Sequence, residues 1–203
     1  SELYCDQLLY QNRGFPLYVP EPQRNLPAEY KAKGVTIGDV GRVTPEGAFD
    51  FLFNVYCSAH HPINANGVPD DFSPLPSYLE SNVFCLDYDP GDFVASSTVE
   101  ECERESDDTS AVAYVSEFPG TEFRFKSRGP QGAVLALPQG SHLTKLEHLE
   151  TLRRYAAKHA ESWYRHVNAP EGRGRQLVNG FLYLITGCEQ AESWGMACYQ
   201  NVE

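Results

Sequence analysis

Apolar and polar positions alternate in one segment of the first half of the chain, a pattern that is typical of a strand. From residue 48 to 56, Phe or Val occupies every second position, and Asp50 and Asn54 lie between them. A period of two predicts a half-buried strand. A Pro-Glu-Gly turn precedes it, so residues 35–56 are predicted to form a strand, a turn and a second strand. Other short apolar runs between Gly and Pro predict strands at 83–86, 111–116, 121–127 and 133–137.

A helical period of three and four appears nearer the C-terminal end, from Leu146 to Val167. Charged residues fill the opposite face and form pairs four residues apart. Ser141 or Thr144 is expected to cap the helix, because Thr144 and Glu147 have the spacing of a capping box. These features predict one long amphipathic helix at about 142–167. The residues expected to face the core are Leu149, Leu152, Ala156, Ala160 and Trp163.

The predicted fold class is α+β: an antiparallel β-rich domain, with the long helix packed on a sheet and a C-terminal hairpin at 181–199. The N-terminal segment 1–34 has four prolines within twelve positions, which exclude a long helix or a central strand there. We expect it to be an arm that packs over the domain. The sequence contains no internal repeat and no sharp boundary, so residues 1–203 are predicted to be a single domain.

The charge of the chain narrows its range of partners. The formal net charge is -12, and this sign repels nucleic-acid backbones and anionic membrane surfaces. No run approaches the roughly 20 apolar residues of a membrane-spanning helix. We therefore expect neither nucleic acid nor a membrane as a partner. Residues 96–110 combine many acids with a single base, which predicts an acidic flexible loop.

Six cysteines are spread over the chain, which is too long to need a disulfide framework. No asparagine begins an Asn-x-Ser/Thr glycosylation sequence. We therefore expect reduced thiols and a cytoplasmic location. No cofactor motif is present, and no cofactor is predicted.

Cys57, His60 and His61 have half the spacing of a zinc site, and Asp70 and Asp71 follow within reach of the same loop. A structural zinc site needs four ligands, and no second half is visible. The preferred interpretation is therefore a core cysteine followed by a polar turn, without a metal. The alternative is a metal- or cysteine-dependent hydrolase in which the thiol or a metal-bound water is the nucleophile.

Three histidines, His148, His159 and His166, fall on one edge of the predicted helix. They indicate either a pH-sensitive seam or, as we prefer, histidines at the helix boundary that bond to neighbouring backbone.

Two further groups of residues are candidates for binding. Arg173 and Arg175 form a small basic loop that can receive a carboxylate or phosphate, although pairing with the protein's own acids is preferred. Tyr18, Phe72 and Tyr78 lie among prolines, as recognition residues often do. A non-enzymatic binding or scaffold module for a protein or small ligand is therefore favoured over the hydrolase. The oligomeric state stays open.

Short motifs spread over nearly the whole chain carry a resemblance to a known family. They lie at 38–41 (Gly-Asp-Val-Gly), 49–53, 61–64, 68–72, 132–138, 155–164, 182–187 and 193–195. With these motifs the chain resembles a family of uncharacterised proteins expanded in mushroom-forming basidiomycete fungi. The resemblance implies no activity, cofactor or catalytic residue, and associates the chain with recognition or defence. Since members continue past the position of Glu203, it also implies that the chain is a fragment of a longer protein.

Overall fold

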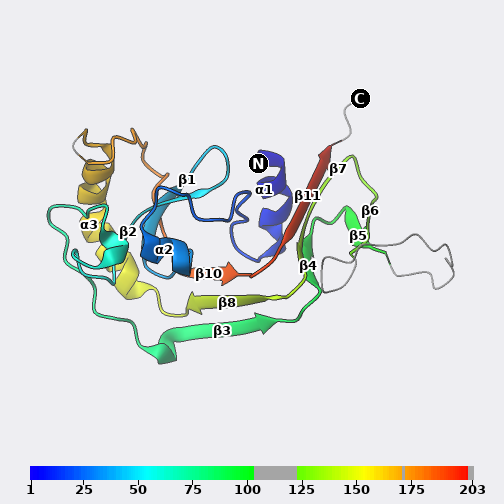
Figure 1. Cartoon of the computed structure of the whole chain (residues 1–203), viewed down its shortest axis with the longest axis horizontal. Coiled ribbons are helices and arrows are strands. Elements are labelled where there is room, and N and C mark those ends of the chain that lie inside the picture. Colours follow the sequence, from blue (N-terminus) through cyan, green and yellow to red (C-terminus); the bar gives the residue numbers. More distant parts are fainter. Residues whose placement is uncertain (103–122, 171, 201–203) are drawn as a thin grey trace. The chain divides into compact units, whose positions relative to one another are not determined.

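A computed structural model of the chain describes residues 1–102, 123–170 and 172–200 (Figure 1). Within these ranges it contains small antiparallel sheets, one long helix and two C-terminal strands, which confirms the predicted α+β class. The residues group into two compact units. Unit 1 comprises 1–16, 87–142 and 189–203, and unit 2 comprises 17–86 and 143–188. Because each unit combines separate segments, no boundary can be seen along the sequence. The prediction of a single domain stays a prediction.

Unit 1 is built on a three-stranded antiparallel sheet of order β11-β7-β4. Tyr4 and Leu8 of its first helix are buried in one cluster with Val94 and Ala133 of the sheet. The short strands β5 and β6 lie between β4 and β7 in the sequence and pair with each other in an antiparallel direction. The elements are α1 (Glu2–Leu8), a 3₁₀ turn (Leu9–Gln11), β4 (Asp92–Ala95), β5 (Val99–Glu101), β6 (Phe125–Ser127), β7 (Gln131–Leu137) and β11 (Gly195–Gln200).

Unit 2 holds the long helix and a sheet of order β2-β1-β9. The predicted strand, turn and strand at 35–56 is confirmed as the antiparallel pair of β1 and β2. Its elements are α2 (Ala28–Lys33), β1 (Asp39–Val43), β2 (Phe49–Asn54), 3₁₀ turns at Pro62–Asn64 and Glu80–Asn82, α3 (Glu150–Asn168) and β9 (Tyr183–Leu184).

The remaining sheet has the order β10-β8-β3, with β3 at Val83–Tyr88, β8 at Ser141–Leu146 and β10 at Gly187–Gln190. The division between the units falls within each of these strands, so the chain passes from one unit to the other along them. The two C-terminal strands are β10 and β11, and each of them joins a different sheet.

Strand β2 differs from the half-buried strand that the alternation predicts, because both of its faces are covered. Asp50, Leu52 and Asn54, expected on the solvent side, are 1%, 0% and 3% exposed. The pairing passes from Val40–Phe53 directly to Gly41–Phe51, so Leu52 is the extra residue of a β-bulge. Leu52 and Phe53 consequently join the same core cluster, and the period of two is broken at this point.

The helix begins later than predicted, because the segment assigned to its first turns is strand β8. Thr144 lies in that strand and forms no capping box, and the helix N-cap is Leu149 without a side-chain cap. The reason is that β8 pairs with β3 and β10, and a tight turn precedes it. Gly140 has φ +75, and a Cβ there would lie 2.1 Å from the carbonyl oxygen of Tyr88. This turn joins β7 to β8 and leads into a strand instead of a helix.

The face of α3 that is buried also differs from the predicted face. Leu152 and Trp163 are buried as expected, whereas Leu149, Ala156 and Ala160 are half-buried. Tyr155 OH donates a hydrogen bond to the carbonyl of Ser73 at 2.6 Å, which gives its polar end a partner inside the fold. The residues of α3 that are buried are Leu152, Tyr155, His159, Trp163 and Val167.

Truncation of Leu152 tests this orientation of the helix. Leu152 is 2% exposed, so Leu152→Ala should lower the free energy of unfolding by about 2–5 kcal/mol, the range for large-to-small changes in a core. Leu149→Ala should cost less because Leu149 is half-buried. The exposed Thr151 is the control, and Thr151→Ala should stay within about 0.5 kcal/mol. Urea denaturation measures all three, and equal losses for Leu149 and Leu152 would contradict the observed face.

The Pro-rich N-terminal segment contains short helices on either side of its prolines, and neither a long helix nor a central strand. Its second half is part of a core and not an arm, since Leu26 and Tyr30 are buried with Phe51 of β2. In the predicted acidic loop, residues 99–101 are strand β5, and 103–110 lie outside the described residues. The strand predicted at 111–116 lies outside them as well.

Candidate functional site

Cys57, His60 and His61 lie close in sequence but do not form a reactive group in the structure. The imidazole Nδ1 of His61 accepts a hydrogen bond from the main-chain N–H of Ile63 at 3.1 Å and caps a 3₁₀ turn. His60 is exposed, and the half-buried Cys57 packs against the core cluster of β2. Burial raises the pKa of the Cys57 thiol, whereas a nucleophilic cysteine needs a lowered one. The hydrolase hypothesis stays a prediction without geometric support.

The interactions of Asp70 and Asp71 that the structure shows are with residues of helix α3. The carboxylate Oδ2 of Asp71 is 3.6 Å from Nδ1 of His159, and hydrogen bonds from Ser162 and His159 lower the pKa of Asp71. Asp70 acts electrostatically on His166. Within the described ranges, no three His, Cys, Asp or Glu side chains come together in a way that could hold a metal ion.

The aromatic candidates lie in different surroundings. Phe72 is part of the core of unit 2, where its ring packs edge-on to Phe53 at 5.8 Å. Tyr18 and Tyr78 are exposed to 37% and 38%, and the ring of Tyr78 also packs edge-on to Tyr56 at 4.9 Å. Phe72 is therefore a packing residue, and Tyr18 and Tyr78 stay predicted binding residues.

The predicted stripe of three histidines is reduced to two. Because α3 starts at Glu150, His148 precedes the helix and is exposed, while His159 is buried and His166 is half-buried on the helix.

Arginine side chains converge on one buried carboxylate in unit 2. Asp50 lies on β2, directly opposite Arg42 in the register with β1, and Nε of Arg42 is 3.0 Å from its Oδ2. Arg175 approaches the same carboxylate from the loop after α3, with Nε 3.2 Å from Oδ2 and a hydrogen bond of 3.3 Å to Oδ1. Two guanidinium groups thus share a carboxylate that is itself 1% exposed.

The loop that carries Arg173 and Arg175 is held by the C-terminal end of α3. The last carbonyls of a helix have no partner within the helix. Here the N–H of Arg173 donates to the carbonyl of His166 at 3.2 Å, and the N–H of Arg175 to that of Val167 at 3.0 Å. A Cβ on Gly172 would lie 2.0 Å from the His166 oxygen, so this close approach requires glycine. The backbone therefore fixes where both arginines emerge.

Arg173 has no carboxylate partner among the described residues. Its Nη2 donates to the carbonyl of Leu52 at 3.0 Å, and its Nε is buried without a hydrogen bond. Burial, followed by the charge of Arg175, lowers the pKa of Arg173, whereas Asp50 raises it. A buried N–H of a cation that lacks an acceptor, as at Nε of Arg173, costs free energy until an acceptor reaches it.

We call Arg42, Asp50, Arg173 and Arg175 the arginine site. Its described residues carry three positive charges and one negative charge, which leaves two positive charges in excess. The carboxylate is enclosed, but 23% of the Arg42 side chain and 31% of the Arg175 side chain are exposed. Guanidinium groups bind carboxylate and phosphate oxygens through paired hydrogen bonds. The arrangement is suited to binding an anionic group.

The sequence identified Arg173 and Arg175 but missed the other two members. Arg42 and Asp50 lie in strands, where charged residues are read as the solvent-facing side of the alternation. The signal that could have found them is their opposite charge at equal distance from the turn at 44–48, which places them across from each other in a hairpin.

A second buried polar group lies where β1 and β2 meet the following loop. Asp39 accepts hydrogen bonds from the N–H of Thr36 at 2.7 Å and from Nδ2 of Asn54 at 2.8 Å. The N–H of Asn54 donates to Oδ1 of Asn64, whose amide donates to the carbonyl of Cys57 at 3.1 Å. Burial raises the pKa of Asp39 to about 7, although the bonds from Thr36 and Asn54 lower it. Because its partners belong to the protein itself, we assign this group to folding and not to binding.

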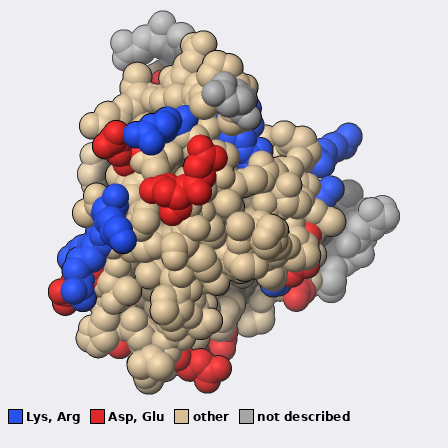
Figure 2. Space-filling view, turned by 90° about the vertical axis from the view of Figure 1, so that its left-hand side faces the viewer, with Lys and Arg blue, Asp and Glu red and all other residues tan. Residues whose placement is uncertain are grey.

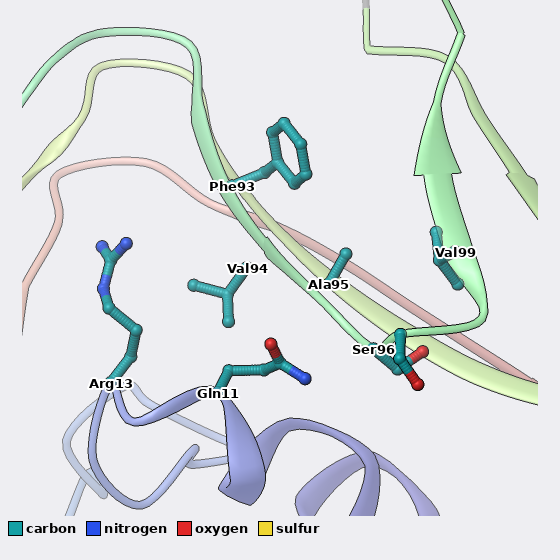
Figure 3. A pocket seen from close by; sticks show the side chains of 8 residues that line it. Gln11, Arg13, Phe93, Val94, Ala95, Ser96 and Val99 are labelled. Atoms are coloured by element: carbon teal, nitrogen blue, oxygen red, sulfur yellow. The ribbon is translucent and has the colours of Figure 1, made fainter.

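Unit 1 has a shallow hollow of about 380 Å³ beside β4. Figure 3 shows the Gln11 amide extending toward Ala95 and Ser96, while the Arg13 guanidinium extends away from it. That guanidinium is engaged: it pairs with Asp92 and Glu189 and lies 3.5 Å from the centre of the Tyr88 ring. The hollow therefore lacks the uncompensated charge of the arginine site. Its described lining residues are Gln11, Arg13, Phe93, Val94, Ala95, Ser96, Ser97 and Val99.

Comparison of the chain with known protein families, with curated proteins and with solved structures found no match. Among the described residues, none of the helices is long and apolar enough to cross a membrane.

Proposed function

We propose that the protein is a non-enzymatic binding module whose arginine site recognises a carboxylate or phosphate group of a protein or small-molecule partner. The observation that carries this proposal is the charge imbalance: Arg42 and Arg175 share the buried carboxylate of Asp50, and the neighbouring Arg173 has no carboxylate partner among the described residues. The second oxygen acceptor that would satisfy Arg173 is missing from the described residues. An anionic ligand would supply it and would offset the excess charge.

The position of the site in an acidic chain supports a specific role. The formal net charge is -12, so an anion is repelled by the protein as a whole and attracted only locally. Figure 2 views the side on which α3 lies in Figure 1, and shows basic and acidic side chains beside one another with broad uncharged areas around them. A surface on which positive and negative side chains lie next to one another favours recognition of a single anionic group over binding of a long polyanion.

Membership of the fungal family and a cytoplasmic location stay predictions that rest on the sequence. The association of that family with recognition agrees with a binding module, but it identifies no ligand.

The proposal is tested by titration of the protein with inorganic phosphate, in which binding is monitored through the amide signals of residues 172–175 in NMR spectra. We expect saturable binding to the wild type. Arg173→Gln should weaken it about ten-fold or more, because a hydrogen bond to a charged group contributes about 1.5–3 kcal/mol. Arg173 is the best position for the change, since its removal takes no partner from Asp50.

The matched control is Arg154→Gln, which removes an exposed arginine that pairs with Glu150 on α3. Its phosphate affinity should equal that of the wild type apart from the small general effect of one charge. Equal weakening in both variants, or binding of phosphate that never saturates, would contradict the proposed function.

A further inference from the structure

His166 lies in the last turn of α3, and neighbouring elements enclose its imidazole. The ring packs edge-on to Phe53 of β2, with 6.3 Å between the ring centres. On another side lies Gly67, where a Cβ would be 3.9 Å from Cε1 of His166. The Nε2 atom is buried and has no hydrogen-bond partner among the described residues. The fold therefore holds a titratable nitrogen whose bonding capacity it does not use.

Charged groups from two different loops act on this imidazole. The main-chain N–H of Arg173 donates to the main-chain carbonyl of His166, and its guanidinium donates to the carbonyl of Leu52, the residue before Phe53. Asp70 belongs to the loop before β3. Burial, followed by the charge of Arg173, lowers the pKa of His166, whereas Asp70 raises it. Strand β2 contributes the uncharged ring of Phe53. The residue that opposes protonation of His166 is thus a member of the arginine site.

We infer, on the basis of the proposed function, that His166 couples anion binding at the arginine site to the uptake of a proton. The protein then holds its anionic ligand more tightly in mildly acidic than in neutral solution. Arg173 carries the coupling because its guanidinium, a member of the arginine site, is bonded to the carbonyl of Leu52, and the next residue, Phe53, packs against the imidazole.

The physical step is the cancellation of one charge. An anion next to Arg173 offsets the guanidinium charge, and a proton from solvent can then bind His166 at a lower electrostatic cost. Coupling between two binding events is reciprocal, so protonation of His166 raises the affinity for the anion by the same factor. The carboxylate of Asp70 favours the protonated form, because it raises the pKa of His166.

Sulfate is the appropriate probe, because it remains a dianion between about pH 5 and about pH 7.5, the interval in which histidine titrates. From the higher to the lower pH, the Kd for sulfate should fall about five-fold or more in the wild type, at the low end of usual coupling factors. In His166→Gln, the Kd for sulfate should not show this fall. His60→Gln, at an exposed histidine, is the matched control and should behave as the wild type.

A measurement on the unaltered protein makes the test independent of how well His166→Gln folds. The imidazole signals of His166 are titrated by NMR with and without saturating sulfate, and the pKa should be higher with it. If sulfate binds but leaves that pKa unchanged, and all three proteins share one pH dependence, the coupling is wrong and the proposed function stands. If sulfate does not bind saturably at either pH, both are overturned.

Discussion

Asparagine in place of Asp50 is expected to lower the free energy of unfolding by about 3 kcal/mol. Removal of one partner from a buried ion pair costs about 3–5 kcal/mol, because the other charge is left uncompensated. We expect the lower end since Arg42 and Arg175 keep 23% and 31% of their side chains exposed. Urea denaturation of the wild type and of Asp50→Asn measures the difference.

The control for this change is Glu161→Gln, which removes the partner of Arg165 on the outer side of α3. That pair is exposed, with 70% and 88% of the two side chains accessible, so the cost should stay below about 0.5 kcal/mol. A loss for Asp50→Asn as small as that of the control would show that Asp50 does not organise the arginines.

The same variant also separates a binding site from a purely structural cluster. Without the Asp50 carboxylate, the described part of the arginine site has three uncompensated positive charges instead of two. Phosphate should therefore stabilise Asp50→Asn more than it stabilises the wild type. At a phosphate concentration of a hundred times the Kd of the variant, the free energy of unfolding of the variant should rise by about 2.7 kcal/mol. Sodium chloride of the same ionic strength is the control for screening. Equal stabilisation of both proteins by phosphate and chloride would contradict an anion site.

The sequence was sufficient for the fold class because the hydrophobic period is local information. The pair of β1 and β2 followed from alternating Phe residues and a Pro-Glu-Gly turn, as found. The start of the helix was wrong for a tertiary reason. Residues 141–146 read as the first turns of α3, but they are paired between β3 and β10, which are distant in the sequence. Such pairing overrides a capping signal that contributes about 1 kcal/mol.

Local information was also insufficient for the site. Arg173 and Arg175 were visible as a basic loop, but Asp50, the partner of Arg175, precedes it by more than a hundred residues. Asp50 is buried because both faces of β2 are covered, and this cover leaves no mark in the hydrophobic pattern. Conversely, Cys57 and His60 are neighbours in sequence, and sequence proximity alone suggested a chemistry that their contacts do not support.

The stability of the protein is expected to fall as the pH rises from about 4 to about 7, because of Asp39. Burial raises the pKa of Asp39 from 3.8 to about 7 in the folded state. Between these values the folded protein binds a proton that the unfolded chain does not, so each pH unit removes up to about 1.4 kcal/mol of stability. The contribution is complete below the unfolded pKa and is lost above the folded one, up to about 4 kcal/mol in total.

Urea denaturation at several pH values, on the wild type and on Asp39→Asn, measures this contribution. Asparagine cannot titrate, so the free energy of unfolding of Asp39→Asn should not fall in this way as the pH rises. This holds whatever the substitution costs at a single pH. His166 acts in the opposite direction: its lowered pKa removes stability as the pH falls, and it does so in both proteins. The difference between the two curves therefore isolates Asp39. Asp6→Asn, at an exposed position, should reproduce the wild-type slope. Parallel curves for the wild type and Asp39→Asn would mean that the hydrogen bonds from Thr36 and Asn54 outweigh burial and keep the carboxylate ionised.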